Sequence, residues 1–183
     1  MQIRDATSAD LSAITGIYAD SVREGVASYE LTPPDEAEMA RRMTAITSNG
    51  YPYLAADGDD GSLLGYAYAS AFRTRPAYRW LVEDSIYVAP EARGKGVGSS
   101  LLEVLIARCE ALGFRQMIAV IGGGHPASIA LHHKAGFSSA GMIRGSGHKH
   151  GRWLDTVFMQ RTLGEGTTTD PDPQSYPGTL SSG

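Results

Sequence analysis

The stretch that decides the fold of this chain is Arg93-Gly94-Lys95-Gly96-Val97-Gly98. It follows an apolar run at residues 85–88 and precedes an amphipathic run at residues 101–112, an order that predicts strand, glycine-rich turn and helix. Glycines let successive backbone N–H groups point at one place, and the start of a helix adds partial positive charge. The stretch therefore predicts a phosphate-binding turn, in which Arg93 and Lys95 supply further positive charge.

Other phosphate-binding loops fit this chain poorly. A Walker loop would need glycine at Ala89 and serine or threonine at Gly96, and a dinucleotide fingerprint beginning at Gly94 would need glycine or alanine at Ser99. A second run, Gly122-x-Gly124-x-x-Ala127, does have dinucleotide spacing. Only roughly 40 foldable residues follow it, too few for the further parallel units of such a domain. We therefore do not expect a dinucleotide site at the second run.

Composition limits the classes of protein. The 183 residues suit one domain with a sizeable core, and the net charge of −4 argues against nucleic acid as the main partner. The N-terminus has no signal-peptide pattern and no window is long and apolar enough to span a bilayer, so we expect a cytoplasmic protein without membrane partners. The single cysteine, Cys109, excludes an internal disulfide and falls in step with Leu102, Leu105 and Leu112, which predicts a buried, inert thiol.

The pattern along the chain predicts a mixed α/β fold. Strands are expected at residues 3–4, 51–56, 63–71, 80–88, 114–121, 137–143 and 153–161. Helices are expected after the Thr7-x-x-Asp10 capping box, from Thr32-Pro33-Pro34-Asp35 with a proline in the first position, after the glycine turn, and from Pro126 to Gly136. Residues 1–163 form one domain, and residues 164–183, rich in Gly, Thr, Asp, Pro and Ser, are predicted to be a disordered tail.

The pattern Arg/Gln-x-x-Gly-x-Gly/Ala, between a strand and a helix, resembles the pyrophosphate loop of the GNAT superfamily of N-acetyltransferases. The stretches at residues 80–88, 127–137 and 151–155 resemble the phosphinothricin N-acetyltransferase branch, so that the resemblance covers residues 2–162. It implies transfer of an acetyl group from acetyl-CoA to the α-amino group of phosphinothricin and of methionine sulfoximine or sulfone. It also implies a mostly antiparallel sheet with a V-shaped splay between its two central strands, about four flanking helices, and a homodimer.

The resemblance assigns the acetyl-CoA contacts. The backbone of one strand segment would hold the pantetheine arm and thioester like an added strand, the glycine loop would hold the pyrophosphate, and three further residues would flank the cofactor. The strand segment is Ser85, Ile86, Tyr87 and Val88; the loop is Arg93, Gly94, Lys95, Gly96, Val97, Gly98 and Ser99; the flanking residues are Gly124, Ser128 and His133.

Glu83 is the candidate general base. Only a neutral amine attacks a thioester, and a nearby carboxylate can take the ammonium proton directly or through water. Glu83 precedes Ile86 by three strand residues, about 10 Å, which leaves room for a substrate or water between them. The alternatives are a surface glutamate or an ion-pair partner of Arg79.

The general acid stays open. Superfamily members often carry a tyrosine where this chain has His132. His132 could protonate the departing thiolate, water could do so, or the thiolate could leave unaided because a thiol is already acidic, with a pKa of about 8.5.

The resemblance also places residues around the amino-acid substrate: Phe72, Arg73, Thr74, Val82, Glu83 and Asp84. Arg73 would bind a carboxylate or phosphinate, whereas Arg75 could equally be part of a solvated loop. Strand alternation points Asp84 away from Glu83 unless the strand bulges. Tyr29 could reach the site of a neighbouring subunit or simply pack in the core.

The five histidines do not predict a metal site. His132 and His133 would point about 100° apart on a helix. His148 and His150 lack a third ligand nearby, so we expect a flexible basic hairpin at residues 148–151 and no metal.

Two rival functions remain. A protein or peptide N-acetyltransferase would need an open groove, whereas Phe72, Tyr78 and Trp80 favour a closed pocket. A non-catalytic acyl-CoA sensor would have no use for Glu83.

Overall fold

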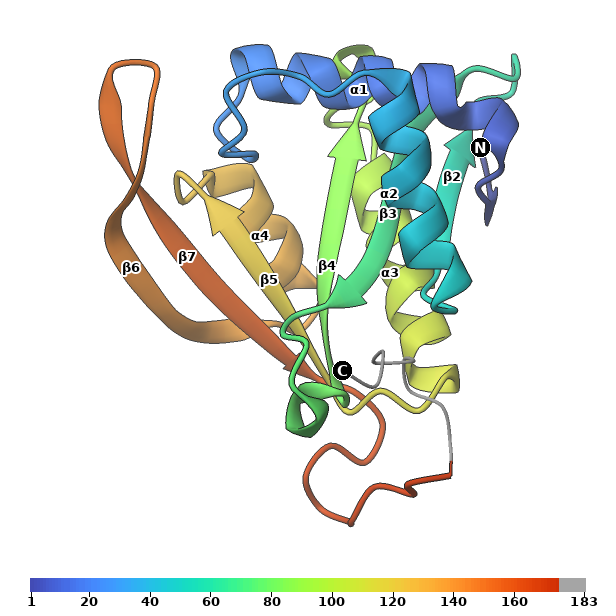
Figure 1. Cartoon of the computed structure of the whole chain (residues 1–183), viewed down its shortest axis with the longest axis vertical. Helices are drawn as coiled ribbons and strands as arrows, with labels where there is room; N and C mark the ends of the chain where they lie inside the picture. Colours follow the sequence, from blue (N-terminus) through green and yellow to red (C-terminus); the bar gives the residue numbers. More distant parts are fainter. Residues whose placement is uncertain (175–183) are drawn as a thin grey trace.

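The computed structural model describes residues 1–174, which form a seven-stranded sheet with four α-helices (Figure 1). The strand order is β1-β2-β3-β4-β5-β7-β6, and every neighbouring pair is antiparallel except β4 and β5. The strands are β1 (Gln2–Asp5), β2 (Tyr53–Asp57), β3 (Leu63–Ala71), β4 (Leu81–Val88), β5 (Gln116–Gly122), β6 (Ser138–Lys149) and β7 (Arg152–Thr162). The α-helices are α1 (Leu11–Glu24), α2 (Glu36–Ser48), α3 (Val97–Ala111) and α4 (Pro126–Lys134), with single 3-10 turns η1 (Ser8–Asp10), η2 (Pro76–Tyr78) and η3 (Pro90–Ala92).

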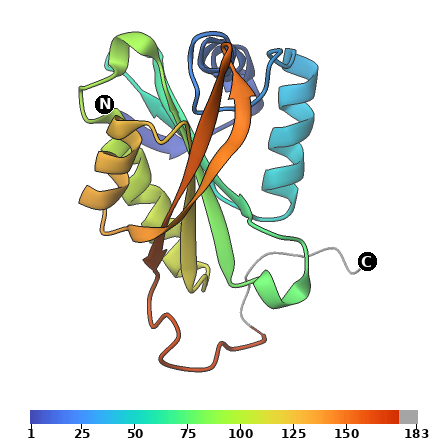
Figure 2. The ribbon, with the colours of Figure 1, turned by 90° about the vertical axis from the view of Figure 1, so that its left-hand side faces the viewer.

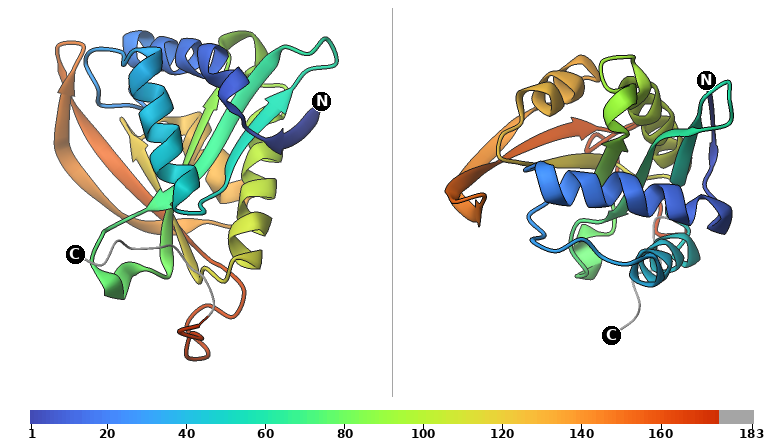
Figure 3. Two further views of the ribbon diagram at one scale, coloured as in Figure 1. Left: turned by 45° about the vertical axis from the view of Figure 1, so that its right-hand side comes forward. Right: turned by 90° about the horizontal axis from the view of Figure 1, so that it is seen from above.

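The helices cover both faces of the sheet. Figures 2 and 3 show α1 and α2 on one side and α3 and α4 on the other. The apolar side of α3 supplies Leu101, Leu102 and Leu105 to the core, and Cys109 is fully buried beside them. Burial raises the pKa of the Cys109 thiol to about 12, so the predicted buried thiol is confirmed.

The start of α2 differs from the prediction. The carboxylate of Asp35 accepts a hydrogen bond from the Glu38 N–H at 2.8 Å, so Asp35 is the N-cap and both prolines lie before the helix. A capping carboxylate satisfies an otherwise unpaired N–H group, which outweighs the preference of proline for the first helical position.

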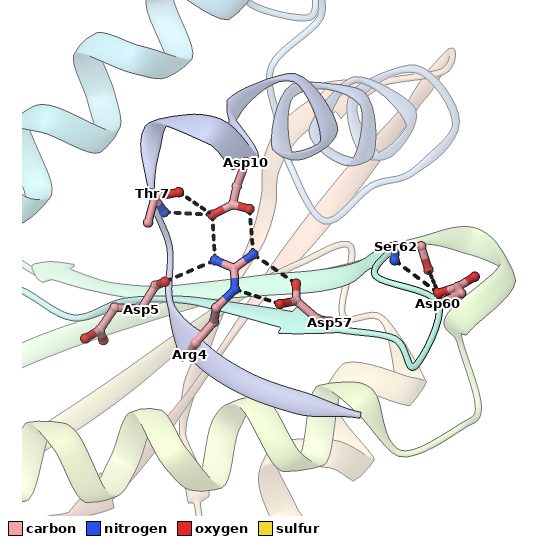
Figure 4. A network of polar contacts seen from close by, with 7 residues as sticks. All are labelled: Arg4, Asp5, Thr7, Asp10, Asp57, Asp60 and Ser62. Atoms are coloured by element: carbon pink, nitrogen blue, oxygen red, sulfur yellow. Dashed lines mark hydrogen bonds and ion pairs between the residues drawn. The ribbon is translucent and has the colours of Figure 1, made fainter.

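One ion-pair network joins the N-terminal elements (Figure 4). The Arg4 guanidinium on β1 bonds both carboxylate oxygens of Asp10 before α1, at 2.8 and 2.7 Å, and both of Asp57 on β2, at 2.6 and 3.0 Å. Asp10 also accepts from the Thr7 N–H, which completes the predicted capping box. Arg4 and Thr7 lower the pKa of Asp10 to about 2.

The β6–β7 hairpin leans away from the rest of the sheet (Figure 1). It is longer than predicted, and its tip is not the flexible basic turn expected from the sequence, because Lys149 is buried and donates to the Ser28 carbonyl at 2.7 Å. That carbonyl belongs to the α1–α2 loop, so the tip and the loop are tied together.

The segment after β7 begins as turns. Leu163 is fully buried, and Arg115 donates to the Gly166 carbonyl and the Thr169 hydroxyl. The predicted disorder of residues 164–183 stays a prediction, and its last part, residues 175–183, lies outside the described residues.

Candidate active site

The parallel pairing of β4 with β5 ends part-way along both strands. Leu81 to Asp84 pair with Gln116 to Ala119, whereas residues 85–88 pair only with β3 in the described part of the chain. Figure 1 shows β4 and β5 diverging beyond that point. The predicted V-shaped splay is therefore confirmed, and backbone groups at residues 85–88 face an open notch instead of a neighbouring strand.

The glycine loop lies directly after this notch. Gly94 and Gly96 have φ angles of +74° and +87°, and Gly96 caps the N-terminus of α3. This left-handed conformation is strained for side-chain-bearing residues, although an added Cβ would meet nothing within 4 Å at either position. The backbone shape thus requires glycine at both positions, and it places the loop at the N-terminus of α3, where unpaired N–H groups of a helix favour an anion.

A groove of about 1160 Å³ connects the notch with the glycine loop. Its walls are the second half of β4, the loop before α3, the end of β5, one side of α4, and the end of α1 with the loop that follows it. Of the predicted acetyl-CoA residues, the lining includes Ser85, Ile86, Tyr87, Val88, Arg93, Gly94, Gly96, Val97, Gly98, Ser99 and Ser128. Lys95, Gly124 and His133 are not part of the lining.

Glu83 lies one residue before the pairing of β4 and β5 ends, and it lines the groove. Burial, and then the charge of Asp84, raise the pKa of the Glu83 carboxyl to about 7, although Arg73 acts in the opposite direction. No ion pair within residues 1–174 joins Glu83 to Arg79, whose guanidinium lies 4.9 Å from the centre of the Trp80 ring. A carboxyl that titrates near neutral pH is suited to proton transfer.

Asp84 and His132 form a buried pair across the sheet–helix interface. Asp84 Oδ2 lies 2.9 Å from His132 Nε2, and their side chains are 2% and 5% exposed. His132 Nδ1 lies 2.7 Å from the Ser128 carbonyl oxygen. The two residues come from β4 and α4, so the pair fixes α4 against the strand that carries Glu83.

The predicted substrate residues are divided between two places. Arg73 and Thr74, with Arg75 and Tyr78, line a separate pocket of about 330 Å³. Phe72 packs there against the Tyr78 ring, with the Arg73 guanidinium over its face. Val82 is fully buried in the hydrophobic core and lines neither pocket. Strand alternation turns its side chain towards the core, so Val82 does not shape the substrate pocket as expected.

Tyr29 is held by its own chain. Its hydroxyl donates to the Asp155 carbonyl at 3.0 Å and accepts from the Gly123 N–H at 3.1 Å and from the Thr156 hydroxyl at 2.9 Å. The ring fills the space where a Cβ on Gly147 would lie, 2.6 Å away. These contacts fit the packing alternative and make Tyr29 part of the groove wall, while its reach into a neighbouring subunit stays a prediction.

The comparisons with known proteins agree with this geometry. Residues 3–158 match the family described as the acetyltransferase (GNAT) domain. The chain belongs to the GNAT acetyltransferase family.

Close relatives of this GNAT acetyltransferase carry more specific names. It is 54% identical to a phosphinothricin N-acetyltransferase of Alcaligenes faecalis over 89% of this chain and 83% of the relative. It is 43% identical to an L-methionine sulfoximine/L-methionine sulfone acetyltransferase of Pseudomonas aeruginosa over 88% and 94%. A crystal structure of a phosphinothricin acetyltransferase from Sinorhizobium meliloti in complex with AcCoA matches with a TM-score of 0.96 at 64% identity, covering 98% of this chain and 97% of that one.

The structure of this GNAT acetyltransferase also adds residues that the sequence did not indicate. Asp20, Ser21 and Glu24 line the groove from the end of α1, followed by Val26 and Ala27. The first three recur at helical spacing beside the buried residues of α1, and this spacing is the signal that could have found them, but polar residues on a helix usually face solvent.

Neither a metal centre nor a membrane span was found within residues 1–174 of this GNAT acetyltransferase. No group of three or more His, Cys, Asp or Glu side chains is placed to hold a metal ion. None of the helices there has the length and apolar character that crossing a membrane requires.

Proposed function

We propose that this chain transfers the acetyl group of acetyl-CoA to the α-amino group of small amino-acid analogues, with phosphinothricin and methionine sulfoximine or sulfone as the first substrates to test. The observation that carries the proposal is Glu83, a largely buried carboxyl with a pKa near 7 at the point where β4 and β5 separate. The names of the relatives from Alcaligenes faecalis and Pseudomonas aeruginosa support the substrate class.

In the proposed mechanism, the open edge at residues 85–88 binds the pantetheine arm as an added strand, and the loop at residues 93–99 binds the pyrophosphate. Arg73 binds the acidic group of the substrate. Glu83 takes the ammonium proton and releases it to solvent, and the neutral amine attacks the thioester carbonyl. Glu83 then accepts the second proton that the nitrogen loses, and collapse of the tetrahedral intermediate releases the amide and the thiolate of coenzyme A.

The test is release of free thiol from acetyl-CoA by the purified chain, with phosphinothricin, methionine sulfoximine and a panel of short peptides as acceptors. We expect turnover with the amino-acid analogues. Turnover with peptides alone would instead favour a peptide N-acetyltransferase, a possibility kept open by a 39% identical structure named ribosomal-protein-alanine N-acetyltransferase from Brucella melitensis. Binding of acetyl-CoA without any turnover would favour the sensor.

Replacing the base gives the second test. We expect Glu83→Gln to lower turnover at pH 7 by about 100-fold, because general-base catalysis contributes on the order of 10²–10⁴ in rate. The dissociation constant for acetyl-CoA, measured by calorimetry, should stay unchanged. Because the pKa of the Glu83 carboxyl is raised from 4.5 to about 7 in the folded state, ionising it lowers the free energy of unfolding of the parent chain as pH rises over that range. The variant lacks this carboxyl, so at neutral pH its free energy of unfolding should be no lower than that of the parent chain. Full activity of the variant would remove Glu83 from the mechanism.

We also propose a cytoplasmic homodimer whose single catalytic domain spans residues 1–163. The support for dimerisation is the exposure of large apolar side chains on the β6–β7 hairpin: Met142 is 49%, Ile143 53% and Trp153 72% exposed. Such side chains on one hairpin are typical of an interface. Light scattering on the parent chain and on Ile143→Lys tests this, and a monomeric parent chain would contradict it.

A further inference from the structure

Three polar side chains form a row that ends in the groove. Asp84 on β4 bonds His132 on α4, and Ser128, one turn earlier on α4, lies next to the other ring nitrogen of His132, with Oγ 3.4 Å from Nδ1. All three residues line the groove, but Asp84 and His132 are almost wholly buried, whereas Ser128 is half-buried and is the most exposed of the three. The row thus leads from the interior towards the place where the thioester would lie.

The contacts of His132 fix where its protons are. Nδ1 lies 2.7 Å from the Ser128 carbonyl oxygen, which can only accept a hydrogen bond, and Nε2 faces a carboxylate oxygen. Nδ1 therefore donates to the carbonyl oxygen; with Asp84 ionised, Nε2 donates as well and the ring is an imidazolium. The second oxygen of Asp84 is buried and has no hydrogen-bond partner among residues 1–174, which leaves His132 to balance the carboxylate charge.

The proton on Nδ1 decides the role of the Ser128 hydroxyl. Because Nδ1 already carries a hydrogen, the Ser128 oxygen can only accept from it, and its own hydrogen is left to point elsewhere. The same fact excludes a hydrolase-type nucleophilic serine, since His132 has no lone pair with which to take the serine proton. Both N–H groups of His132 have partners within residues 1–174, and Ser128 is the most exposed of the three groove-lining residues, so its hydroxyl is the group best placed to contact the groove contents.

We propose that Ser128 protonates the departing thiolate of coenzyme A, and that His132 and Asp84 are positioning residues that replenish and hold that proton. This inference rests on the proposed acetyl transfer and names the general acid that the sequence left open. When the carbon–sulfur bond breaks, its electron pair goes to sulfur, the Ser128 O–H proton moves to the sulfur, and the His132 Nδ1 proton moves to Ser128 Oγ. His132 then regains one proton from solvent, while Glu83 passes to solvent the two protons that the nitrogen loses, one from the ammonium group and one on forming the amide. One proton is therefore released for each ammonium group acetylated, and charge and atoms balance.

Few other titratable groups face this row. Cys109 of α3 lies near enough to Asp84 for the carboxylate charge to raise the thiol pKa, Glu83 lies on the opposite side of β4, and β5 carries no titratable residue. Arg161 of β7 contacts the Ala135 carbonyl at the far end of α4 and pairs with Glu110. On α4 itself, His133 and Lys134 are exposed. The hydrogen bond and charge of Asp84 outweigh the effect of burial and raise the pKa of His132.

Single-turnover acetyl transfer by the full chain, measured from pH 6 to 10, tests the relay with Ser128→Ala and Ser128→Thr as the matched pair. We expect Ser128→Ala to slow the acetyl-transfer step, measured at saturating acetyl-CoA, by about 10- to 100-fold. Ser128→Thr keeps the hydroxyl and should restore most of the rate. A weaker acetyl-CoA affinity with an unchanged rate would instead make Ser128 a cofactor contact and overturn the proposal.

The two residues behind Ser128 give independent tests. Asp84→Asn should fold, because the new amide can donate to a neutral His132. Since the relay needs a protonated His132 Nδ1 and Nε2, the rate of the parent chain should fall as His132 loses its charge at alkaline pH, and in Asp84→Asn this fall should move to lower pH because the pKa of His132 decreases. Nitrogen NMR of the parent chain should show both ring nitrogens of His132 protonated at pH 7, whether or not turnover is seen. A neutral ring would overturn the relay, whereas absent turnover with a charged ring would count against the proposed function alone.

Discussion

At the scale of single residues, two adjacent carboxylates on β4 have opposite surroundings. Glu83 faces the groove and forms no ion pair within residues 1–174, and burial outweighs the charge of Arg73 and keeps the carboxyl partly protonated near neutral pH. Asp84 faces α4 and is paired with His132. Alternation along a strand is what separates the two side chains, and it lets neighbouring residues take different parts in proton transfer.

The pH dependence follows from Glu83. Since only the ionised carboxylate accepts a proton, kcat/KM should rise with pH through an apparent pKa of about 7. Arg73 lowers the pKa of Glu83, so Arg73→Met should shift this rise to higher pH in addition to any loss of substrate affinity. The pH profile of kcat/KM for each protein checks this, and an unshifted rise in the variant would show that Arg73 does not act on the base.

The sequence indicated which side chains are functional candidates, but it did not indicate which residues these side chains contact. Asp84 and His132 are far apart in sequence, and only the pairing of β4 with β5 and the return of α4 bring them within 2.9 Å. Tyr29 was ambiguous for the same reason, since its partners Gly123, Asp155 and Thr156 lie on distant elements.

At the scale of elements, the sequence predicted most strands and helices because each one has its own local signal. The glycine loop predicted the start of α3, and alternating residues predicted β3 at its observed bounds. The length of β6 could not be predicted, because ten of its twelve residues are exposed outright and give no apolar alternation. The extent of β6 depends on pairing with β7 instead.

The glycine loop allows a prediction about function that is separable from folding. Gly96→Ala places a side chain at a φ of +87°, which costs about 1–2 kcal/mol per left-handed residue. We expect the loop to change shape to relieve this strain, so that its N–H groups no longer converge and acetyl-CoA binds at least tenfold more weakly. Calorimetry measures the affinity. Gly16→Ala is the control, because Gly16 lies within α1 and outside the groove lining, and an added Cβ there would meet nothing within 4 Å.

At the scale of the whole molecule, the Arg4 network joins the sheet edge to the first helix (Figure 4). Arg4→Met leaves Asp10, whose side chain is only 10% exposed, without its cation. We expect a loss of about 1–2 kcal/mol in the free energy of unfolding, reduced from the value for a fully buried pair because Arg4 is partly solvated. Urea denaturation checks this, with the exposed pair of Arg41 and Glu38 as control: Arg41→Met should leave the midpoint unchanged.

The same network gives a pH signature. The folded-state pKa of Asp10, about 2, lies below the ordinary value of 3.8, so its stabilising contribution is complete above pH 3.8 and disappears as pH falls towards 2. Between pH 3.8 and 2, the free energy of unfolding should therefore fall less for Arg4→Met than for the parent chain. Equal acid sensitivity of both proteins would contradict the assignment.

The early end of the β4–β5 pairing has a consequence for the empty protein. Every second peptide group at residues 85–88 must be hydrated when nothing occupies the notch, since an unpaired buried N–H is costly. Deuterium should therefore enter these amides quickly in the unliganded chain and slowly once acetyl-CoA is added, while the amides of residues 81–84 stay protected throughout. Bound acetyl-CoA would then supply the hydrogen bonds that β5 does not make to this half of β4, and it would stabilise the sheet for as long as it stays bound.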